Sequence, residues 1–470
     1  MREIETDYLV IGAGATGMAF VDSLITHSDF EVAMVDRRHR PGGHWLDAYP
    51  FVRIHQTSAN YGVTSRVLGF DRIDDSGPNA GFYERATAGE ICDYYNRVLE
   101  EQFLATDRFR FFPMSNYSGS DHRLRPSFVS LLTGAETEVK VRRKVVDATY
   151  TESEIPSKHA PTFAIDDNVR LIPPNDLVDQ SGSASGYTVI GAGKTAMDTG
   201  SWLLDQGVDP DAISWIKPRD GWVMNRAMNQ PLDLVGAYMQ LQSRWVAALA
   251  EAESGQDLAH RLEASDVFMR LDRSVEPETF RGAILSRAEL DRLRQIERVV
   301  RLGRVRRIGA DRVTLEHGEI ASDPGQVYVD CTAAGLRPVS ARPIFEPNRI
   351  TMQVVTPGIV PWSAATIGVI EALRDDDAEK NRLCPTSGFT GEVSDALRFA
   401  GVGLKGLMAR GGEPDLAAWN EACRLNPGRG AADHLDDPRV SEAFASLGAS
   451  IGPAMSNLER RFVSFDVSRG

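Results

Sequence analysis

Two glycine-rich stretches have the residue spacing of a dinucleotide-binding turn. They are GAGATG at residues 12–17 and GAGKTA at residues 191–196. In such a turn the first glycine permits a tight bend, the second lets a pyrophosphate approach the backbone, and a small third residue lets the following helix pack closely. The helix N-terminus then turns its partial positive charge toward the phosphates. We therefore predict two dinucleotide sites in one chain.

The first turn leads into an acidic residue at the distance expected for a ribose contact. Asp36 follows Gly12 by 24 residues and ends the next predicted strand, where a carboxylate binds ribose hydroxyls. Arg37 or Arg38 beside it is expected over the adenosine half of the ligand. A glycine-rich turn in an unrelated α/β fold would lack this agreement of strand, turn, helix and acid. The predicted contacts within the turn are Gly12, Gly14, Ala15 and Gly17.

The second turn leads into cations instead of an acid. The strand that follows its helix ends in Lys217-Pro218-Arg219. An acid repels a 2′-phosphate whereas Arg or Lys pairs with it, so this ending favours NADP over NAD. The alternative is a second unit that has lost its ligand and is kept for structure. The predicted contacts are Gly191, Gly193, Lys194, Thr195, Ala196, Lys217 and Arg219.

The segment PRDGWVMNR, residues 218–226, follows the second unit and carries candidate substrate contacts. Asn225 and Arg226 are candidates to reach the nicotinamide side of the ligand or a substrate. Trp222 is a candidate to line the pocket. The alternative is that all three side chains pack beneath a helical cap.

Each turn needs a strand before it and a helix after it, and the apolar pattern supplies both. The first strand–helix–strand unit is predicted at residues 7–11, 15–26 and 31–35, and the second at 187–190, 195–206 and 212–216. Ser181–Gly186 is a Gly/Ser-rich connector and a plausible domain boundary. Helical periods at 234–264 and 287–300 predict an insertion or cap, and the last hundred residues are predicted to be mainly helical. The pattern predicts an α/β fold.

Composition excludes several other classes of function. The 470 residues carry a net charge of −14, which argues against nucleic acid, since phosphate binding needs a basic surface. The four cysteines, at 92, 331, 384 and 423, form no close pair, so neither a disulfide framework nor a zinc site is expected. The N-terminus lacks the pattern of a signal peptide, and no stretch resembles a membrane span. We expect a cytoplasmic protein, with a homodimer left open.

Three motifs together resemble the flavin-containing monooxygenase branch of the two-dinucleotide-binding-domain flavoproteins. They are GAGATG, VDRRHRPGGHW and GAGKTA, and the resemblance covers roughly the first half of the chain, with VDCTAAG and WSAATIGVIEAL later. It implies FAD on the first unit, with Gly43 and Trp45 added to the contacts already named, and NADPH on the second. Without the family, Gly42-Gly43 is only a turn and Trp45 a packed aromatic residue.

The resemblance also implies how the later motifs serve the flavin. The turn from Asp330 to Gly335 would return the chain to the FAD domain. A helix opening at Ser363-Ala364-Ala365 would point its N-terminus, with Ala364, at the pyrimidine edge of the flavin, where a reduced flavin carries negative charge. The implied domains are residues 1–160 and 305–470 for FAD, and residues 161–304 for NADP, with a helical insertion at about 230–300.

Residues 52–63, VRIHQTSANYGV, resemble the family segment that places a polar amide beside the flavin. Gln56 falls on that position. His55 is the acid–base candidate because imidazole titrates near neutral pH. Asn60 and Tyr61 are expected on the same wall. The alternative is a polar loop that packs against FAD without taking part in catalysis.

The resemblance implies a monooxygenase in which NADPH reduces FAD, O2 forms a flavin C4a-(hydro)peroxide, and a dry pocket protects that species. The substrate is expected to be a small organic molecule, with N-hydroxylation, C-hydroxylation and Baeyer–Villiger-type insertion all open. One alternative is an FAD oxidase or dehydrogenase with a structural second unit, because Pro173-Pro174 stands where the family linker has a His, although Phe163 is present. A second alternative is a non-catalytic, redox-sensing flavoprotein.

Overall fold

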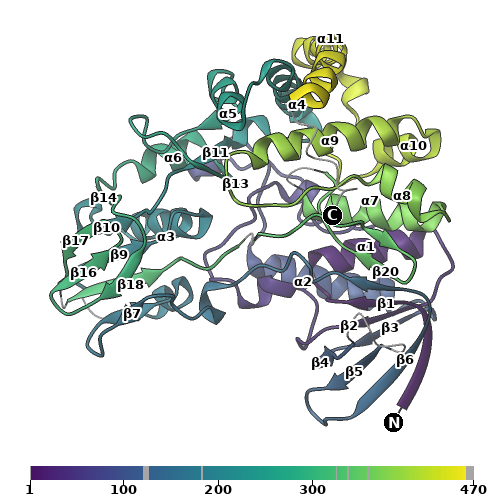
Figure 1. Ribbon diagram of the computed structural model, residues 1–470, viewed down its shortest axis with the longest axis horizontal. Helices are drawn as coiled ribbons and strands as arrows, with labels where there is room; N and C mark the ends of the chain where they lie inside the picture. The colour runs from purple at the N-terminus through teal and green to yellow at the C-terminus, as the bar shows by residue number, and fades with distance from the viewer. Residues whose placement is uncertain are drawn as a thin grey trace.

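The computed structural model describes residues 2–119, 126–180, 184–323, 325–335, 338–356 and 359–461. It has two units built on parallel sheets and a helical layer that spans them (Figure 1). The first three residues of the predicted connector at 181–186 lie outside the described residues. No described helix combines the length and the apolar character that crossing a membrane requires.

The first unit is a sheet of order β19-β20-β6-β1-β2-β3. Its centre is parallel: β1 (Arg2–Ile11) lies between β6 (Glu136–Asp147) and β2 (Val32–Val35), and β3 (Phe109–Phe112) follows β2. The sequence predicted only the apolar end of β1, because residues 2–6 include three charged residues and only one apolar residue. The remaining strands are β4 (Ser115–Tyr117), β5 (Ser127–Ser130), β19 (Phe345–Glu346) and β20 (Arg349–Thr351).

Helices cover this sheet through residues that the apolar pattern singles out. α1 (Ala15–Thr26), at the predicted position, packs against α7 (Val360–Leu373). Both helices are buried along most of their length, which is the pattern of core helices rather than surface helices. α2 (Ala88–Val98), α8 (Asp377–Leu383) and α10 (Pro414–Ala422) add residues to the same core.

The second unit is a five-stranded parallel sheet of order β14-β10-β9-β18-β8. Its α3 (Lys194–Asp205) follows the second glycine turn. A small antiparallel sheet lies beside it, comprising β15 (Val305–Ile308), β16 (Arg312–Leu315) and β17 (Gly318–Ala321), with β7 (Ala164–Ile165) at one edge. The parallel strands are β8 (Arg170–Ile172), β9 (Gly186–Ile190), β10 (Ile213–Ile216), β14 (Arg298–Val300) and β18 (Gln326–Asp330).

The boundary predicted at residue 305 differs from the observed one. Residues 305–330 stay with the second unit, because β18 pairs in parallel with β9 and its Val327, Tyr328 and Val329 are buried there. The chain returns to the first unit only beyond Asp330. The helix predicted at 287–300 is correct only for its first half, since α6 (Arg287–Leu293) ends early. The β-branched Val299 and Val300 belong instead to β14, which pairs with β10 in the second unit.

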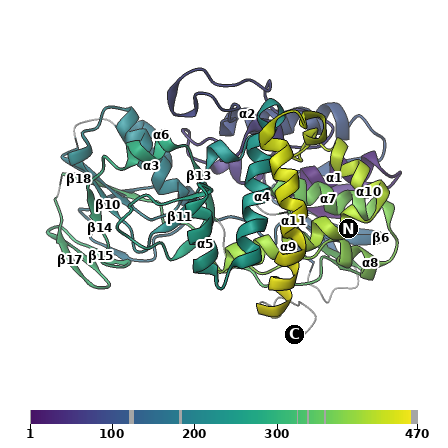
Figure 2. The same ribbon diagram turned by 90° about the horizontal axis from the view of Figure 1, so that it is seen from above.

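A helical layer lies across both units. α4 (Val235–Glu251) and α11 (Pro438–Arg461) lie side by side, as Figure 2 shows from above. α5 (Gly255–Ala264) and α9 (Asp395–Gly411) share their apolar core. A three-stranded sheet supports the layer, comprising β11 (Gly221–Asn225), β12 (Phe268–Met269) and β13 (Thr279–Leu285). The C-terminal helices α9 and α11, which were predicted to belong to the FAD domain, therefore pack on the insertion.

Candidate active site

One cavity of about 1530 Å³ lies where the two units and the helical layer meet. Both glycine turns line it, together with the first residues of α7 and one side of the helical layer. A pocket for a single small ligand has a volume of about 300–1,000 Å³. The cavity therefore has room for more than one molecule, and the two turns open into the same space.

Backbone crowding explains the glycines of the first turn. Gly12 has φ +100°, a conformation that L side chains avoid, and a Cβ on Gly17 would overlap the carbonyl oxygen of Gly12. Gly43 has φ +56°, and a Cβ there would lie 2.8 Å from the Cα of Gly14. Gly12, Gly14, Ala15 and Gly43 line the cavity, whereas Gly17 holds α1 against the turn. Gly43 is therefore a second bare backbone approach to the same space.

Asp36 lies at the carboxyl end of β2, on the cavity wall. Its carboxylate accepts hydrogen bonds from the backbone N–H of Ala13 at 2.6 Å and of Arg38 at 2.7 Å. These bonds hold the side chain beside the glycine turn, in the position where an acid binds a ribose. Arg37 also lines the cavity and forms an ion pair with Glu152.

Trp45 and Tyr61 form a fixed aromatic corner of the cavity. The indole N–H of Trp45 donates a hydrogen bond to the Tyr61 hydroxyl at 2.7 Å, and both rings line the cavity. Burial raises the pKa of Tyr61 above its ordinary value. The hydroxyl therefore stays protonated at physiological pH and acts as a neutral hydrogen-bonding group.

His55 and Gln56 line the cavity, but Asn60 does not. The pKa of His55 lies well below its ordinary value, mainly because the side chain is buried. The positive charges of Lys194, Arg85 and Arg226 lower it further. His55 is therefore a neutral imidazole near pH 7. Asn60 accepts a hydrogen bond from the Thr57 hydroxyl at 2.9 Å and donates one to the Arg424 carbonyl at 3.4 Å. These contacts give Asn60 a role in shaping the loop.

The second turn keeps its access to the cavity. Gly191 has φ +132°, and a Cβ there would lie 2.7 Å from the carbonyl oxygen of Cys331. The Trp215 indole N–H donates a hydrogen bond to the Gly191 carbonyl at 2.7 Å. A Cβ on Gly193 would meet nothing within 4 Å, so a phosphate can approach the backbone there. Thr195 lines the cavity, and Ala196 is fully buried behind the turn.

Lys194 is buried at the start of α3 and pairs with Asp198, one turn further along the helix. Asp198 also accepts a hydrogen bond from the Tyr49 hydroxyl of the first unit at 2.8 Å. Burial lowers the pKa of Lys194, while Asp198 and Glu289 oppose that shift. Lys194 is thus a buried, cavity-lining cation paired with Asp198 rather than a solvated one.

The two cations predicted for a 2′-phosphate lie in different places. Lys217 is buried, pairs with Asp220 and does not line the cavity. Asp220 also pairs with Arg301 at 2.9 Å, so the Lys217 ammonium is part of an internal network. Arg219 does line the cavity and pairs with Glu392 at 2.9 Å. The structure therefore separates Lys217 from Arg219.

Sequence reasoning missed two arginines that join Arg219. Arg281 of β13 and Arg304, just before β15, line the same cavity. Burial, and then the charges of Arg219 and Arg304, lower the pKa of Arg281. All three arginines line the same cavity. The RVRR run at 304–307 reads as a solvated strand edge, and nothing local in the sequence distinguishes Arg281. Only the fold brings these side chains to the end of β10.

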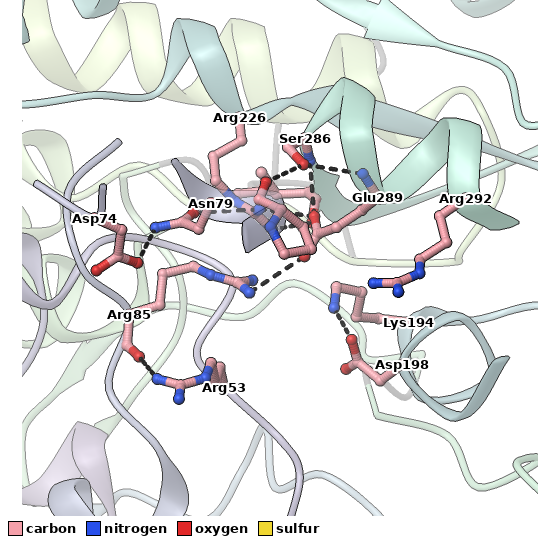
Figure 3. Close-up of polar contacts among 12 residues, drawn as sticks. Arg53, Asp74, Asn79, Arg85, Lys194, Asp198, Arg226, Ser286, Glu289 and Arg292 are labelled. Atoms are coloured by element: carbon pink, nitrogen blue, oxygen red, sulfur yellow. Dashed lines mark hydrogen bonds and ion pairs between the residues drawn. The ribbon is translucent and has the colours of Figure 1, made fainter. Parts of the chain in front are cut away.

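Trp222 lines the cavity, whereas Asn225 and Arg226 do not. The Asn225 side chain accepts a hydrogen bond from the backbone N–H of Ala227 at 3.1 Å and caps a short turn. Arg226 is fully buried and pairs with Glu289 at 2.7 Å, and Arg85 reaches the same carboxylate at 3.2 Å (Figure 3). Since Arg85 belongs to the first unit and Glu289 to α6, this cluster connects the two units behind the site.

Asp330 and Ala364 are also set back from the cavity. Asp330 accepts hydrogen bonds from the backbone N–H and hydroxyl of Thr332, at 2.9 and 2.6 Å, and so shapes the turn whose residues 331–335 line the cavity. α7 begins at Val360, three residues before the predicted start. Its N-terminus therefore presents Val360 and Trp362 to the cavity, and Ala364 is buried in the core.

The described residues contain no group of His, Cys, Asp and Glu side chains that could hold a metal ion. The residues around the cavity are instead of the kinds that hold dinucleotides: two bare-backbone turns, an acid at a strand end and a set of arginines.

Comparisons with known proteins agree with this architecture. Residues 10–66 match a family model described as an NAD(P)-binding Rossmann-like domain. The fold is similar to the polycyclic ketone monooxygenase of the thermophilic fungus Thermothelomyces thermophila, with a TM-score of 0.54, 12% identity and coverage of 96% of this chain and 90% of that one. It is also similar to cyclohexanone monooxygenase bound to ε-caprolactone, with a TM-score of 0.51, 15% identity and coverage of 87% and 98%.

The fold is therefore that of the two-dinucleotide-domain flavin monooxygenases, and the predicted fold class and resemblance are confirmed at that level. More particularly, the chain belongs to the family of the uncharacterized protein Rv2000 of Mycobacterium tuberculosis. The two are 42% identical over 451 residues, which cover 95% of this chain and 82% of that protein. The uncharacterized protein Mb2023 of Mycobacterium bovis matches to the same extent.

Proposed function

We propose that the chain is an FAD- and NADPH-dependent monooxygenase that transfers one atom of O2 to an organic molecule. The observation that carries the proposal is the single cavity into which both glycine turns open. Hydride transfer requires the donor and the flavin to meet in one space closed to bulk water. Bound FAD would supply the redox chemistry, since no side chain of the chain can accept a hydride or activate O2.

The first turn fits FAD. The approach of Gly43 to Gly14 leaves no room for a Cβ, so backbone N–H groups alone face the space where a pyrophosphate would lie. Asp36 at the strand end is placed to accept hydrogen bonds from a ribose. The N-terminus of α7, at Val360 and Trp362, would place its partial positive charge at the opposite wall.

The second turn fits NADPH. Gly193 leaves the backbone open to a phosphate, and Lys194 at the start of α3 supplies a cation there. Arg219, Arg281 and Arg304 would hold the 2′-phosphate that distinguishes NADPH from NADH. This assignment replaces Lys217, whose ammonium pairs with Asp220, by Arg281 of β13 and Arg304 just before β15.

The wall formed by His55, Gln56, Trp45 and Tyr61 would orient the reacting molecules without carrying charge. His55 is neutral at physiological pH, so it can donate or accept one hydrogen bond. The Tyr61 hydroxyl is fixed by the Trp45 indole. A neutral, hydrogen-bonding wall keeps bulk water out while holding an oxygen atom or a carbonyl group in place.

Anaerobic reduction is the most direct test of the proposal. The purified holoenzyme is expected to show the two absorption bands of flavin, and NADPH is expected to bleach them stoichiometrically in the absence of O2. Readmitted air should restore the oxidised spectrum, with NADPH consumption rising when a ketone, sulfide or amine is added. A flavin that NADPH leaves oxidised would favour an oxidase or dehydrogenase with a structural second unit. A protein without a flavin spectrum would overturn the proposal.

A further inference from the structure

The cavity continues beyond the glycine turns into the helical layer. There it is lined by side chains at helical spacing, so that one face of each helix is turned toward it. α4 contributes Leu241, Trp245 and Leu249, and α11 contributes Phe444, Leu447 and Ile451. An amphipathic helix buries its apolar face against a partner. Here part of each apolar face lines the cavity instead of packing against another helix.

α9 completes this arm of the cavity with Ala400, Leu404 and Leu407. The side chains that α4, α9 and α11 present to the cavity include no acid, and their single cation, Arg410, donates a hydrogen bond to the Leu383 carbonyl at 2.8 Å. Burying a charged molecule against such a surface would carry the desolvation penalty of an unpaired ion. The arm suits an uncharged, apolar molecule.

The arm reaches the surface between α9 and α11. Leu407 is 49% exposed and Phe444 is 40% exposed, and both also line the cavity. A residue that is exposed and lines the cavity marks an opening. Large apolar side chains at an opening attract apolar molecules and repel charged ones.

We infer that this arm is the substrate channel, and that it admits an uncharged lipophilic molecule between α9 and α11. The inference rests on the proposed function, because the arm belongs to the same cavity as the wall formed by His55, Gln56, Trp45 and Tyr61. Rigid polycyclic and flexible long-chain molecules share this chemistry, and the experiment separates them.

Substitutions at the opening test the route. Binding of progesterone, a rigid polycycle, and of dodecanone, a flexible chain, is followed on the holoenzyme by quenching of tryptophan fluorescence, since Trp222 and Trp245 line the cavity. Leu407→Glu places a charge in the opening and should slow association by about tenfold, the scale of an uncompensated polar group. Met408→Glu is the matched control, because Met408 is 48% exposed on the same helix but does not line the cavity.

Substitutions within the arm test its size. Ala400→Phe fills the space between α9 and its neighbours and should raise the progesterone Kd by about tenfold or more relative to the cyclohexanone Kd. Lys405→Phe adds the same ring on the exposed side of α9 and should leave both Kd values unchanged. A larger effect on progesterone than on dodecanone identifies rigid rings as the preferred class, and the reverse result identifies flexible chains.

The outcomes separate this inference from the proposed function. If both lipophilic probes bind with equal affinity to Ala400→Phe, Lys405→Phe and the unmodified protein, the channel is overturned even if NADPH still reduces the flavin. If the probes bind as expected but O2 is never transferred to them, the channel stands as a binding site and the monooxygenase proposal fails.

Discussion

At the scale of single residues, backbone crowding is the most specific sign of the flavin site. Gly43 has a positive φ and lies so close to Gly14 that a side chain on Gly43 is not tolerated. Gly43→Ala should therefore push the two turns apart and reduce the flavin bound after purification by about tenfold, a loss of about 1.4 kcal/mol in binding. Gly89→Ala is the control, because a Cβ there meets nothing within 4 Å. Absorbance ratios at the flavin and protein bands measure the occupancy, and equal occupancy in both variants would contradict the assignment.

His55 gives a pH prediction at the same scale. Its pKa is lowered by burial and neighbouring cations, so the unfolded chain binds a proton near the ordinary pKa of about 6.5 while the folded protein does not. The stability that this difference contributes is present above the unfolded pKa and is lost as the pH falls below it. His44, whose pKa is lowered to about 4, acts in the same direction.

Urea unfolding at pH 7 and pH 5 tests this sign. The free energy of unfolding of the unmodified protein should fall more steeply over that interval than that of His55→Gln, since the variant lacks the group that must stay neutral. The remaining decrease in the variant belongs to His44 and to paired carboxylates. Parallel decreases in the two proteins would mean that His55 is protonated in the fold.

At the scale of elements, we propose that arginines at the strand ends decide which nicotinamide cofactor is preferred. Arg281 of β13 and Arg304 before β15 reach the cavity, while Arg306 of β15 pairs with Glu316 at 2.7 Å outside it. Arg281→Ala and Arg304→Ala should each raise the Kd for NADPH by about tenfold, the scale of a charge-assisted hydrogen bond, and leave the Kd for NADH nearly unchanged. Arg306→Ala should change neither value.

Anaerobic titration of flavin reduction with each cofactor gives both Kd values. If both Kd values rose equally, the two arginines would instead contact the part that NADPH and NADH share.

The end of strand β10 also explains why Lys217 differs from Arg219. Lys217 directly follows the last residue of β10, and its buried ammonium pairs with Asp220. Arg219 lies two residues further along the chain and lines the cavity.

At the scale of the whole molecule, the two units are joined through the carboxylate of Glu289. Arg226 of the second unit and Arg85 of the first both pair with it in a buried setting (Figure 3). Removing one partner of a buried ion pair leaves an uncompensated charge. Glu289→Ala should therefore lower the free energy of unfolding by about 3–5 kcal/mol.

Two further variants show whether the charge is responsible. Glu289→Gln keeps an acceptor for the capping hydrogen bond from the Ser286 backbone N–H, now at 2.8 Å, and should lose nearly as much stability if the two buried arginines dominate. Arg287 lies on the same helix as Glu289 and forms an exposed ion pair with Asp266. Arg287→Ala breaks this pair and should cost about 0–1 kcal/mol of stability. A Glu289→Gln protein as stable as the unmodified chain would assign the effect to the helix cap alone.

The sequence by itself determined the two turns, because their chemistry is local. Gly12, Gly14 and Gly191 follow apolar strands, and the bend, the open backbone and the helix that follows are set within about 15 residues. The acid at Asp36 could be placed for the same reason, since one strand–helix–strand unit fixes its position. The fold class could likewise be predicted, because apolar periodicity and glycine spacing indicate both strand–helix–strand units.

Only the tertiary structure decided which side chains share the cavity. Arg281 and Arg304 join Arg219 from strands far along the chain, whereas Asn60, Arg226 and Ala364, each credible by position, are buried behind the wall. The extent of the second unit was decided in the same way, since β18 belongs to whichever sheet offers its apolar residues a partner strand. Long-range packing sets these outcomes, and a local pattern carries no record of which elements will meet.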